Sequence, residues 1–457
     1  MGLAAHIFEQ CPTRKFRHMI HDEVDKWVDK IIDEVFEDDK EPTVMELSQL
    51  FSKTKQKFFG ACFQALIEHK YAGLLEQEYA PCPQCGKMCK KRRGNLKELV
   101  TMQGPSVLKR PWFYCVDCSY GFSPLDKALE ISRKKYQFDV QKKSTRAAAE
   151  IPFSSGSKLF EELTDHPVSD HFMHDTFEAV GAHACLEDVI PSREEIAKRC
   201  RRVNERSWRP VLIVASDGAH VPTRPKAKRN EKRGKGRWQE AKGFRIYLLG
   251  KDRIDHIASW HQIQNEEQFG EDLFFAASQI PQENLRIGLL GDGADWLWKH
   301  MVACFPEGRP ILDYFHCAEH IHKVANMQYG EKSQKCLEWV ESTMTRLFYA
   351  EVDNVIWGLQ RMKPRDNLAK EEIRKLIGYL RNNRERIHYR GDRIGGYPIG
   401  SGGIESANKF ICHTRMKRSG AWWVKETGNE MLGIRCAIYN GTYDKIFDKY
   451  KKSQMSL

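Results

Sequence analysis

The first 71 residues carry hydrophobic side chains at helical spacing. Apolar residues follow the i, i+3, i+4, i+7 pattern of an amphipathic helix in an acidic stretch: Val24, Trp27, Val28, Ile31, Ile32, Val35 and Phe36. Pro42 ends this helix, and Thr43 with Glu46 forms a capping-box pattern that predicts a second helix to about Tyr71. The stripe has two interpretations: the helices pack on their own domain, or they bind a second copy or a partner helix.

The pattern of hydrophobic and polar residues changes twice in the middle of the chain. Residues 81–124 contain short apolar runs, glycine and paired cysteines, whereas residues 126–203 return to helical spacing. Two short helices are predicted at Ser157–Leu163 and Val168–Val180, joined by the tight segment Thr164–Pro167. This spacing is typical of a helix-turn-helix that binds DNA, but any helical hairpin gives the same pattern.

From Pro210 the pattern becomes rich in strands. The apolar run Pro210–Gly218 ends in Asp-Gly and predicts a buried strand. Further strands are predicted at Phe244–Leu249, Ile254–Trp260, Leu285–Gly291 and Ile311–Leu312, with helices at Glu266–Ile280 and Trp296–Phe305. Strands followed by alternating strands and helices predict a mixed-sheet α/β domain. Residues 317–390 are charged and helical, and a Gly-rich segment precedes a helix from about Ile404.

These changes in the sequence pattern predict that the chain has five parts. They are an N-terminal helical region (1–78), a cysteine-rich module (79–125), a helix-turn-helix-like region (126–206), an α/β core (207–316 and 391–457), and a helical insertion (317–390).

Composition narrows the class of protein. The chain has 457 residues, 41% of them hydrophobic, which fits a globular protein and excludes a mostly disordered one. Its formal net charge of +11 favours a polyanion as partner. No apolar run approaches the roughly 18 residues needed to cross a bilayer, and the N-terminus lacks the order of a signal peptide. We therefore expect a cytoplasmic protein with no membrane partner.

Two CxxC pairs predict a metal site. Cys82 with Cys85 and Cys115 with Cys118 can bring four thiolates to one tetrahedral Zn²⁺, in the manner of a zinc ribbon. Four thiolates fill the coordination shell, so this zinc would be structural. A redox-active CxxC or a chance pairing is the alternative.

Carboxylates follow two of the predicted strands. Asp217 and Asp292 each end a buried apolar run and precede glycine, where an ionised carboxylate is costly unless it is paired or binds a metal. Glu405, at the start of a predicted helix, is the best third ligand. Three such carboxylates can hold two Mg²⁺, or Mn²⁺, for phosphodiester chemistry. Alternatively, each Asp-Gly is an ordinary turn and Glu405 complements its helix dipole. Asp295 is the main rival of Asp292.

Several motifs resemble a known family. They are SDG (Ser216–Gly218), GDGADWLW (Gly291–Trp298), LDYFH (Leu312–His316), GIESANKF (Gly403–Phe410) and RMKRSGAWW (Arg415–Trp423). From about Pro81 the chain resembles DDE transposases with an RNase H-like core, specifically the ISKra group of bacterial insertion sequences. The resemblance implies that Asp217, Asp292 and Glu405 are catalytic. It also relates His316 to the C/D-x-x-H motif of Mutator-like relatives, where it would position DNA. A buried core histidine is the alternative for His316.

Two basic segments flank these carboxylates. Between the first two predicted core strands lie Arg224, Lys226, Lys228, Arg229, Lys232, Arg233, Lys235, Arg237 and Lys242. After Glu405 come Lys409, His413, Arg415, Lys417 and Arg418. Both segments can neutralise DNA phosphates; the alternative for the first is a solvated loop.

Together these features predict a Mg²⁺-dependent DNA transposase that cleaves transposon ends and joins the freed 3′-OH to target DNA. Its partner would be double-stranded DNA, and paired ends favour a homodimer or a larger assembly. Two alternatives stay open: a catalytically silent zinc-containing DNA-binding protein derived from a transposase, and a metal-dependent nuclease without strand transfer.

Overall fold

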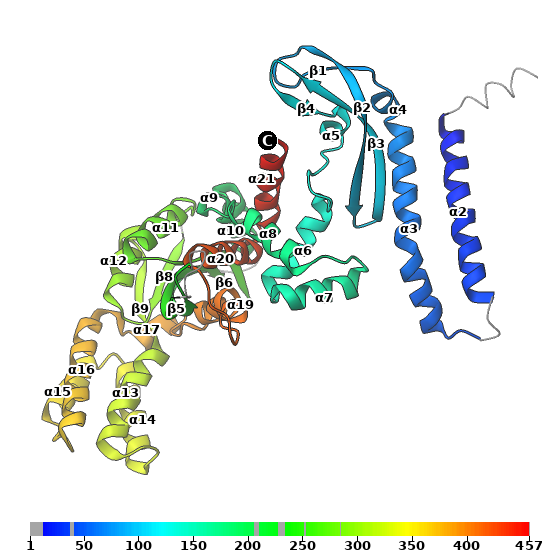
Figure 1. Ribbon diagram of the computed structural model, residues 1–457. Coiled ribbons are helices and arrows are strands. Elements are labelled where there is room, and N and C mark those ends of the chain that lie inside the picture. The colour runs from blue at the N-terminus through cyan, green and yellow to red at the C-terminus, as the bar shows by residue number, and fades with distance from the viewer. Residues whose placement is uncertain are drawn as a thin grey trace, which may run out of the picture. The chain divides into compact units, whose positions relative to one another are not determined.

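The computed structural model describes residues 12–36, 41–204, 210–226, 234–250, 253–283 and 285–456. The chain divides into two units, which are described separately here. The first comprises Met1–Val180 and Phe447–Leu457, and the second comprises Gly181–Ile446. Figure 1 shows the elements of both units.

The first unit begins with two long helices, α2 (Pro12–Phe36) and α3 (Val44–Lys70), as the hydrophobic spacing predicts. They pack through the Trp27 ring, which stacks on Phe58 at a centroid distance of 4.9 Å. The predicted capping box is present: the Glu46 N–H donates to Thr43 Oγ1 over 3.3 Å, and the Thr43 N–H donates to Glu46 Oε2 over 2.8 Å. The short helix α4 (Ala72–Leu75) follows.

An antiparallel sheet holds the cysteine pairs. Its strands are β1 (Tyr79–Pro81), β2 (Met88–Thr101), β3 (Gly104–Cys115) and β4 (Tyr120–Phe122), in the order β1-β2-β3-β4. Helix α3 packs on β3, where the Ser106 hydroxyl donates to the Gly60 carbonyl over 2.8 Å. Ile67, Leu99 and Leu108 form a hydrophobic core against this sheet, and Leu125 of α5 (Pro124–Ala128) packs into the same core.

Helices complete the first unit. They are α6 (Phe138–Glu150), α7 (Phe153–Thr164), α8 (Asp170–Gly181) and the greater part of α21 (Tyr443–Ser456). Helices α7 and α8 match the two predicted short helices, and Asp165 ends α7 in the left-handed conformation (φ 58°). The Tyr450 hydroxyl of α21 donates to Gln141 Oε1 of α6 over 2.6 Å.

A mixed sheet forms the centre of the second unit. Its strands are β5 (Val211–Thr223), β6 (Arg237–Leu249), β7 (Ile254–Ile263), β8 (Arg286–Gly291) and β9 (Arg309–Leu312). The order is β7-β6-β5-β8-β9. Strands β5, β6 and β7 are antiparallel neighbours, whereas β8 pairs parallel to both β5 and β9. The predicted mixed α/β class is confirmed at this level.

Helices cover both faces of this sheet. Phe244 and Trp260 contact α11 (Glu266–Ser278), through the Phe269 ring and the Asp272 carboxylate. Their neighbours Gly243 and His261 face the other way, because side chains alternate along a strand. On that second face lie α18 (Gly402–Ala407) with the π-helical turn Asn408–His413, and α20 (Lys425–Asn440), which packs on β7. Helix α12 (Asp295–Cys304) packs beside α11.

The predicted helical insertion lies between β9 and α18. It contains α13 (Tyr314–Tyr329), α14 (Gln334–Phe348), α15 (Val352–Arg361) and α16 (Asn367–Asn382), and α17 (Tyr389–Ile394) leads back (Figure 1). Helix α13 begins earlier than predicted because Asp313 caps it, accepting a hydrogen bond from the His316 N–H at 2.5 Å.

The unit boundaries differ from the expected ones at two places. Helices α9 (Leu186–Val189) and α10 (Arg193–Asn204) belong to the second unit, because they pack on α20 and β7 respectively. The last residues, from Phe447, belong to the first unit rather than to the α/β core.

Candidate functional site

Aspartates follow neighbouring parallel strands of the mixed sheet at one level. Ala215 of β5 pairs with Leu290 of β8, which pairs with Ile311 of β9. Each of these residues is followed two positions later by an aspartate: Asp217, Asp292 and Asp313. Strand register therefore gathers carboxylates that lie far apart in the sequence, as the sequence predicts for Asp217 and Asp292.

Asp217 does not end its strand, and this corrects the sequence-based expectation. β5 continues to Thr223 because it forms a long antiparallel hairpin with β6, in which Thr223 pairs with Arg237. Only the parallel pairing with β8 ends, at Ala215. Asp217 thus lies just beyond the parallel part of β5, on backbone that β6 still holds in place.

The surroundings of Asp217 disfavour its negative charge. Burial raises the pKa of Asp217 to about 6, and the nearby carboxylates of Asp292 and Glu240 add to this rise. The Gly218 N–H donates to Asp217 Oδ1 over 2.7 Å and, together with His316, opposes the rise in pKa. Because Asp292 and His316 act on Asp217, these three residues form one electrostatic cluster.

A tight turn presents Asp292. Its Oδ1 accepts a hydrogen bond from the Ala294 N–H over 3.0 Å, and its carbonyl accepts one from the Tyr379 hydroxyl over 3.1 Å. Gly293 has a φ of +104°, and a Cβ there would lie 2.9 Å from the Tyr379 ring. Glycine at this position therefore permits both the turn and the approach of Tyr379 from α16.

Glu405 lies in the first turn of α18, as predicted, and its side chain is exposed. The Ser401 hydroxyl donates to Glu405 Oε1 over 3.0 Å. Helix α18 packs against β5 and β6. Among the described residues, however, Asp217, Asp292 and Glu405 do not form a group whose ligand oxygens all lie within 4.8 Å of one another.

Asp313 links the remaining candidate residues. This buried carboxylate accepts hydrogen bonds from the backbone N–H of His316 and of Ser401. The Tyr314 N–H donates to the Ile399 carbonyl over 2.8 Å, so the segment before Glu405 is fixed to the end of β9. The His316 ring is 38% exposed and lies 3.5 Å from Glu319, so it is not the buried core histidine of the alternative interpretation.

Sequence reasoning missed several neighbours of these carboxylates. Glu240 of β6 acts on Asp217, and the Asn408 side chain donates to Asp217 Oδ2 over 2.8 Å. Asn408 follows Glu405 by one helical turn, which was a usable signal. Glu240 and Tyr379 have no comparable local signal, because only strand register and the packing of the insertion bring them here.

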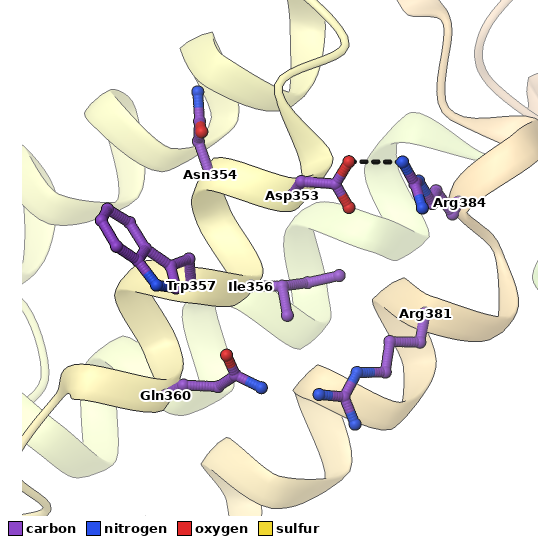
Figure 2. Close-up of a pocket in the computed structure, with 7 residues that line it drawn as sticks. All are labelled: Asp353, Asn354, Ile356, Trp357, Gln360, Arg381 and Arg384. Carbon is purple, nitrogen blue, oxygen red and sulfur yellow. Dashed lines mark hydrogen bonds and ion pairs between the residues drawn. The ribbon is translucent and has the colours of Figure 1, made fainter.

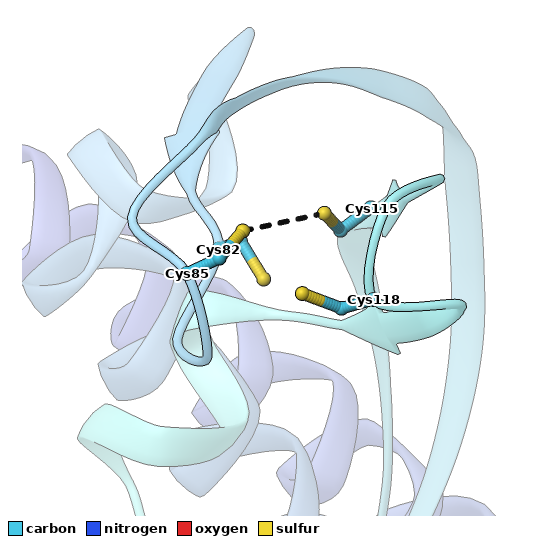
Figure 3. A group of neighbouring side chains, drawn as sticks. All are labelled: Cys82, Cys85, Cys115 and Cys118. Carbon is cyan, nitrogen blue, oxygen red and sulfur yellow. Dashed lines mark hydrogen bonds between the residues drawn. The ribbon is translucent and has the colours of Figure 1, made fainter.

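The four predicted cysteine ligands come together in the first unit. The Sγ atoms of Cys82, Cys85, Cys115 and Cys118 all lie within 4.8 Å of one another (Figure 3). The Cys85 and Cys115 sulfurs are 3.7 Å apart. A tetrahedral ion with Zn–S bonds of about 2.3 Å sets ligand sulfurs about 3.8 Å apart. This cluster could therefore hold a metal such as zinc.

The predicted DNA-binding cations are divided between surface and interior. Those at the loop end of the β5–β6 hairpin and after α18 are exposed or half-buried: Arg224, Lys226, Lys235, Arg237, Lys409, His413, Lys417 and Arg418. Lys228, Arg229, Lys232 and Arg233 lie outside the described residues.

Two basic residues lie in the interior, against expectation. Arg415 is only 4% exposed, its guanidinium lies 5.1 Å from the Trp423 ring centroid, and burial lowers its pKa to about 10. Lys242 is 9% exposed, with its ammonium 3.8 Å from the Trp296 ring centroid. Both cations pack on aromatic faces, and Lys242 also donates a hydrogen bond to Glu240 Oε2.

A separate pocket of about 570 Å³ lies in the helical insertion. Figure 2 shows its residues on α15, on the end of α16 and on the following turn: Asp353, Asn354, Ile356, Trp357, Gln360, Arg381 and Arg384. Asp353 Oδ2 accepts a hydrogen bond from Arg384 over 2.5 Å. None of these residues belongs to the carboxylate cluster, so the pocket and the candidate site are distinct.

The fold and its two clusters define a mixed α/β protein with carboxylates at parallel strands and a four-cysteine module. The chain belongs to UPF0236, an uncharacterised protein family whose profile matches residues 38–452. No curated protein matches it. A solved structure, "Drosophila P element transposase strand transfer complex", is similar over 70% of this chain and 82% of that chain, with 10% identity and a TM-score of 0.26. Within the described ranges, no helix is both long and apolar enough to span a membrane.

Proposed function

We propose that the chain is a metal-dependent DNA transposase of the DDE type, with Asp217, Asp292 and Glu405 as its catalytic carboxylates. The observation that carries the proposal is the adjacency of Asp217 and Asp292 just past the paired parallel strands β5 and β8. The Asp292 carboxylate raises the pKa of Asp217, and a shared divalent cation would relieve this repulsion.

The strand order supports an RNase H-like core. Strands β5, β6 and β7 pair antiparallel, and β8 and β9 extend the sheet on the other side of β5 by parallel pairing. The third proposed carboxylate comes from a helix docked on β5, on the sheet face that also bears Gly243 and His261. The resemblance to the ISKra group in particular stays a prediction.

The donor set fits Mg²⁺ or Mn²⁺, because hard cations prefer carboxylate oxygens. Two such ions would activate the attacking oxygen and stabilise the leaving oxygen of a phosphodiester. The chain's own residues orient the ligands: Ser401 holds Glu405, and the Asp292–Gly293 turn holds Asp292. His316, as a half-exposed neighbour of Asp217, is a candidate for positioning the DNA.

A basic surface at the loop end of the β5–β6 hairpin supports DNA as the substrate. The Trp423 N–H donates to the Pro222 carbonyl over 3.1 Å, and the Arg224 N–H donates to the Trp423 carbonyl over 2.9 Å. These bonds join the segment after α18 to the loop end of the β5–β6 hairpin. The result is one surface that we call the basic hairpin surface: Arg224, Lys226, Lys235, Arg237, Lys417 and Arg418.

The function is tested by incubating the full chain with labelled DNA that carries the inverted repeats flanking its gene, in Mg²⁺. We expect both cleaved ends and products joined to target DNA. Cleavage without joining would identify a nuclease, and binding without either product would identify a silent DNA-binding protein. In both cases the transposase proposal fails. A two-ended complex in the same reaction would support the predicted dimer.

Neutralising the basic hairpin surface should weaken binding without changing sequence preference. In the triple variant Lys226→Gln, Lys235→Gln, Arg237→Gln, we expect the salt slope of log K to fall by about three units, at roughly 0.9 per phosphate contact. Fluorescence anisotropy at several salt concentrations, on specific and random DNA, measures this slope.

The matched control replaces three exposed lysines of the helical insertion: Lys332, Lys335 and Lys363. It should leave the slope unchanged. If the triple hairpin variant loses affinity only for the specific end sequence, these cations read bases, and their assignment to phosphate contacts is wrong.

A further inference from the structure

A row of residues crosses the sheet at the level of Asp217. Asp217 of β5 pairs directly with Gly243 of β6, and Gly243 pairs directly with His261 of β7. Directly opposite residues point to the same face of a sheet, so the Asp217 and His261 side chains flank a position without a side chain. A Cβ at Gly243 would lie 2.1 Å from the His261 ring, so only glycine leaves this space open.

Asn408 fills the gap from the overlying π-helical turn. Its amide is 4% exposed and bridges the row: Nδ2 donates to Asp217 Oδ2 over 2.8 Å, and Oδ1 lies 2.9 Å from His261 Nε2. His261 is fully buried. The two ends of one amide therefore connect the side chains of Asp217 and His261.

The direction of these hydrogen bonds follows from the chemistry of the groups. An ionised carboxylate can only accept, so Asn408 must turn its NH₂ group toward Asp217. Its oxygen then faces His261, and the His261 Nε2 must carry the proton. Burial lowers the pKa of His261 to about 4, so the ring is neutral at pH 7 and Nδ1 is unprotonated. The neutral His261 with its proton on Nε2 thus matches the amide orientation that Asp217 requires of Asn408.

We propose that Asn408 and His261 are positioning residues that hold the Asp217 carboxylate in its metal-binding orientation. This inference rests on the proposed function, because only there is Asp217 a metal ligand. Asn408 donates to Oδ2 and the Gly218 N–H donates to Oδ1, so each carboxylate oxygen keeps one lone pair for the cation. Hydrogen bonds from neighbouring residues orient metal ligands in this way.

The test is the binding of Mn²⁺ alone to the full-length protein, measured by titration calorimetry. Asn408→Ala removes the donor to Asp217, and we expect the affinity of the Asp217-dependent site to fall at least about tenfold. Asp217→Asn identifies that site in the isotherm. His261→Leu should act like Asn408→Ala, whereas His261→Gln keeps an N–H donor at similar reach and should restore most of the affinity.

A second buried histidine–asparagine pair supplies the control. Asn440 Oδ1 lies 2.9 Å from His256 Nε2, and Asn440 also forms hydrogen bonds with Ser259 and Val189. None of its hydrogen-bond partners in the described part of the chain is a candidate carboxylate. Asn440→Ala should lower the unfolding temperature at least as much as Asn408→Ala, yet leave Mn²⁺ affinity unchanged. Equal Mn²⁺ affinity in Asn408→Ala and the wild type, or an equal loss in Asn440→Ala, would overturn the proposal.

The outcomes separate this inference from the proposed function. If the wild type binds Mn²⁺ through Asp217 and Asn408→Ala weakens it, but no DNA is cleaved, the positioning role stands and the transposase proposal fails. If the wild type cleaves and joins DNA while Asn408→Ala and His261→Leu bind Mn²⁺ normally, the function stands and the positioning role fails. A wild type without an Asp217-dependent Mn²⁺ site overturns the positioning role.

Discussion

Asp217→Asn is expected to reduce DNA end cleavage at least about a thousandfold while DNA affinity stays equal or rises. Asparagine keeps the size of the side chain but removes the charge that would hold the cations. Losing several kcal/mol of transition-state stabilisation gives this factor, at about 1.36 kcal/mol per tenfold. Affinity should not fall, because a negative charge facing the phosphates has gone. Single-turnover cleavage and anisotropy on the same DNA measure the two effects.

Asp292→Asn and Glu405→Gln should behave like Asp217→Asn, and double variants should be little worse than single ones. Groups that act as one metal-binding unit are strongly non-additive, because removing any member disables the unit. The result for Glu405 is the most informative of the three. Its side chain is exposed, and among the described residues it does not form with the two aspartates a group whose ligand oxygens all lie within 4.8 Å of one another.

Asp295 provides the control for this set. It begins α12, its side chain is exposed, and it lies near Arg386. Asp295→Asn should therefore keep substantial cleavage. An inactive Asp295→Asn beside an active Asp292→Asn would transfer the catalytic role to Asp295, and near-normal cleavage by Glu405→Gln would remove Glu405 from the site.

Local sequence patterns predicted most elements of the fold. Apolar runs identified the strands of the mixed sheet, period-3.6 spacing identified the helices α2 and α3, and the Thr43–Glu46 pattern located the start of α3. The end of β5 was predicted wrongly because Asp-Gly is a turn signal in isolation. In the structure, pairing with β6 overrides that signal and continues the strand to Thr223.

Local sequence patterns could not predict the contacts that surround Asp217. His261 is 44 positions from Asp217 and reaches it only through strand register and Asn408. The burial of Arg415 was equally hidden, because its neighbours in sequence are exposed cations such as Lys417 and Arg418. The charge of Arg415 alone predicts an exposed side chain. Its burial follows from tertiary packing on Trp423, which the local sequence does not show.

Loss of the cysteine-bound metal is expected to unfold the β1–β4 module. Cys82 and Cys115 are buried in its small core with Phe113 and Phe122, so the metal and the core form together. Structural zinc contributes about 10–16 kcal/mol of binding free energy that is also folding free energy. The purified chain should contain about one zinc, and Cys82→Ser combined with Cys115→Ser should remove it. Elemental analysis and limited proteolysis of the module measure both effects.

Cys89→Ser is the matched control, because Cys89 is a buried thiol of the same core that lies outside the set of four. Its sulfur contacts the Lys87 carbonyl over 3.4 Å, a bond that a serine hydroxyl can also make. Zinc content should therefore stay near one per chain, and the module should stay resistant to protease. Zinc lost from Cys89→Ser but kept in the double variant would make Cys89 a ligand in place of its neighbours. Zinc unchanged in both would exclude a zinc ribbon.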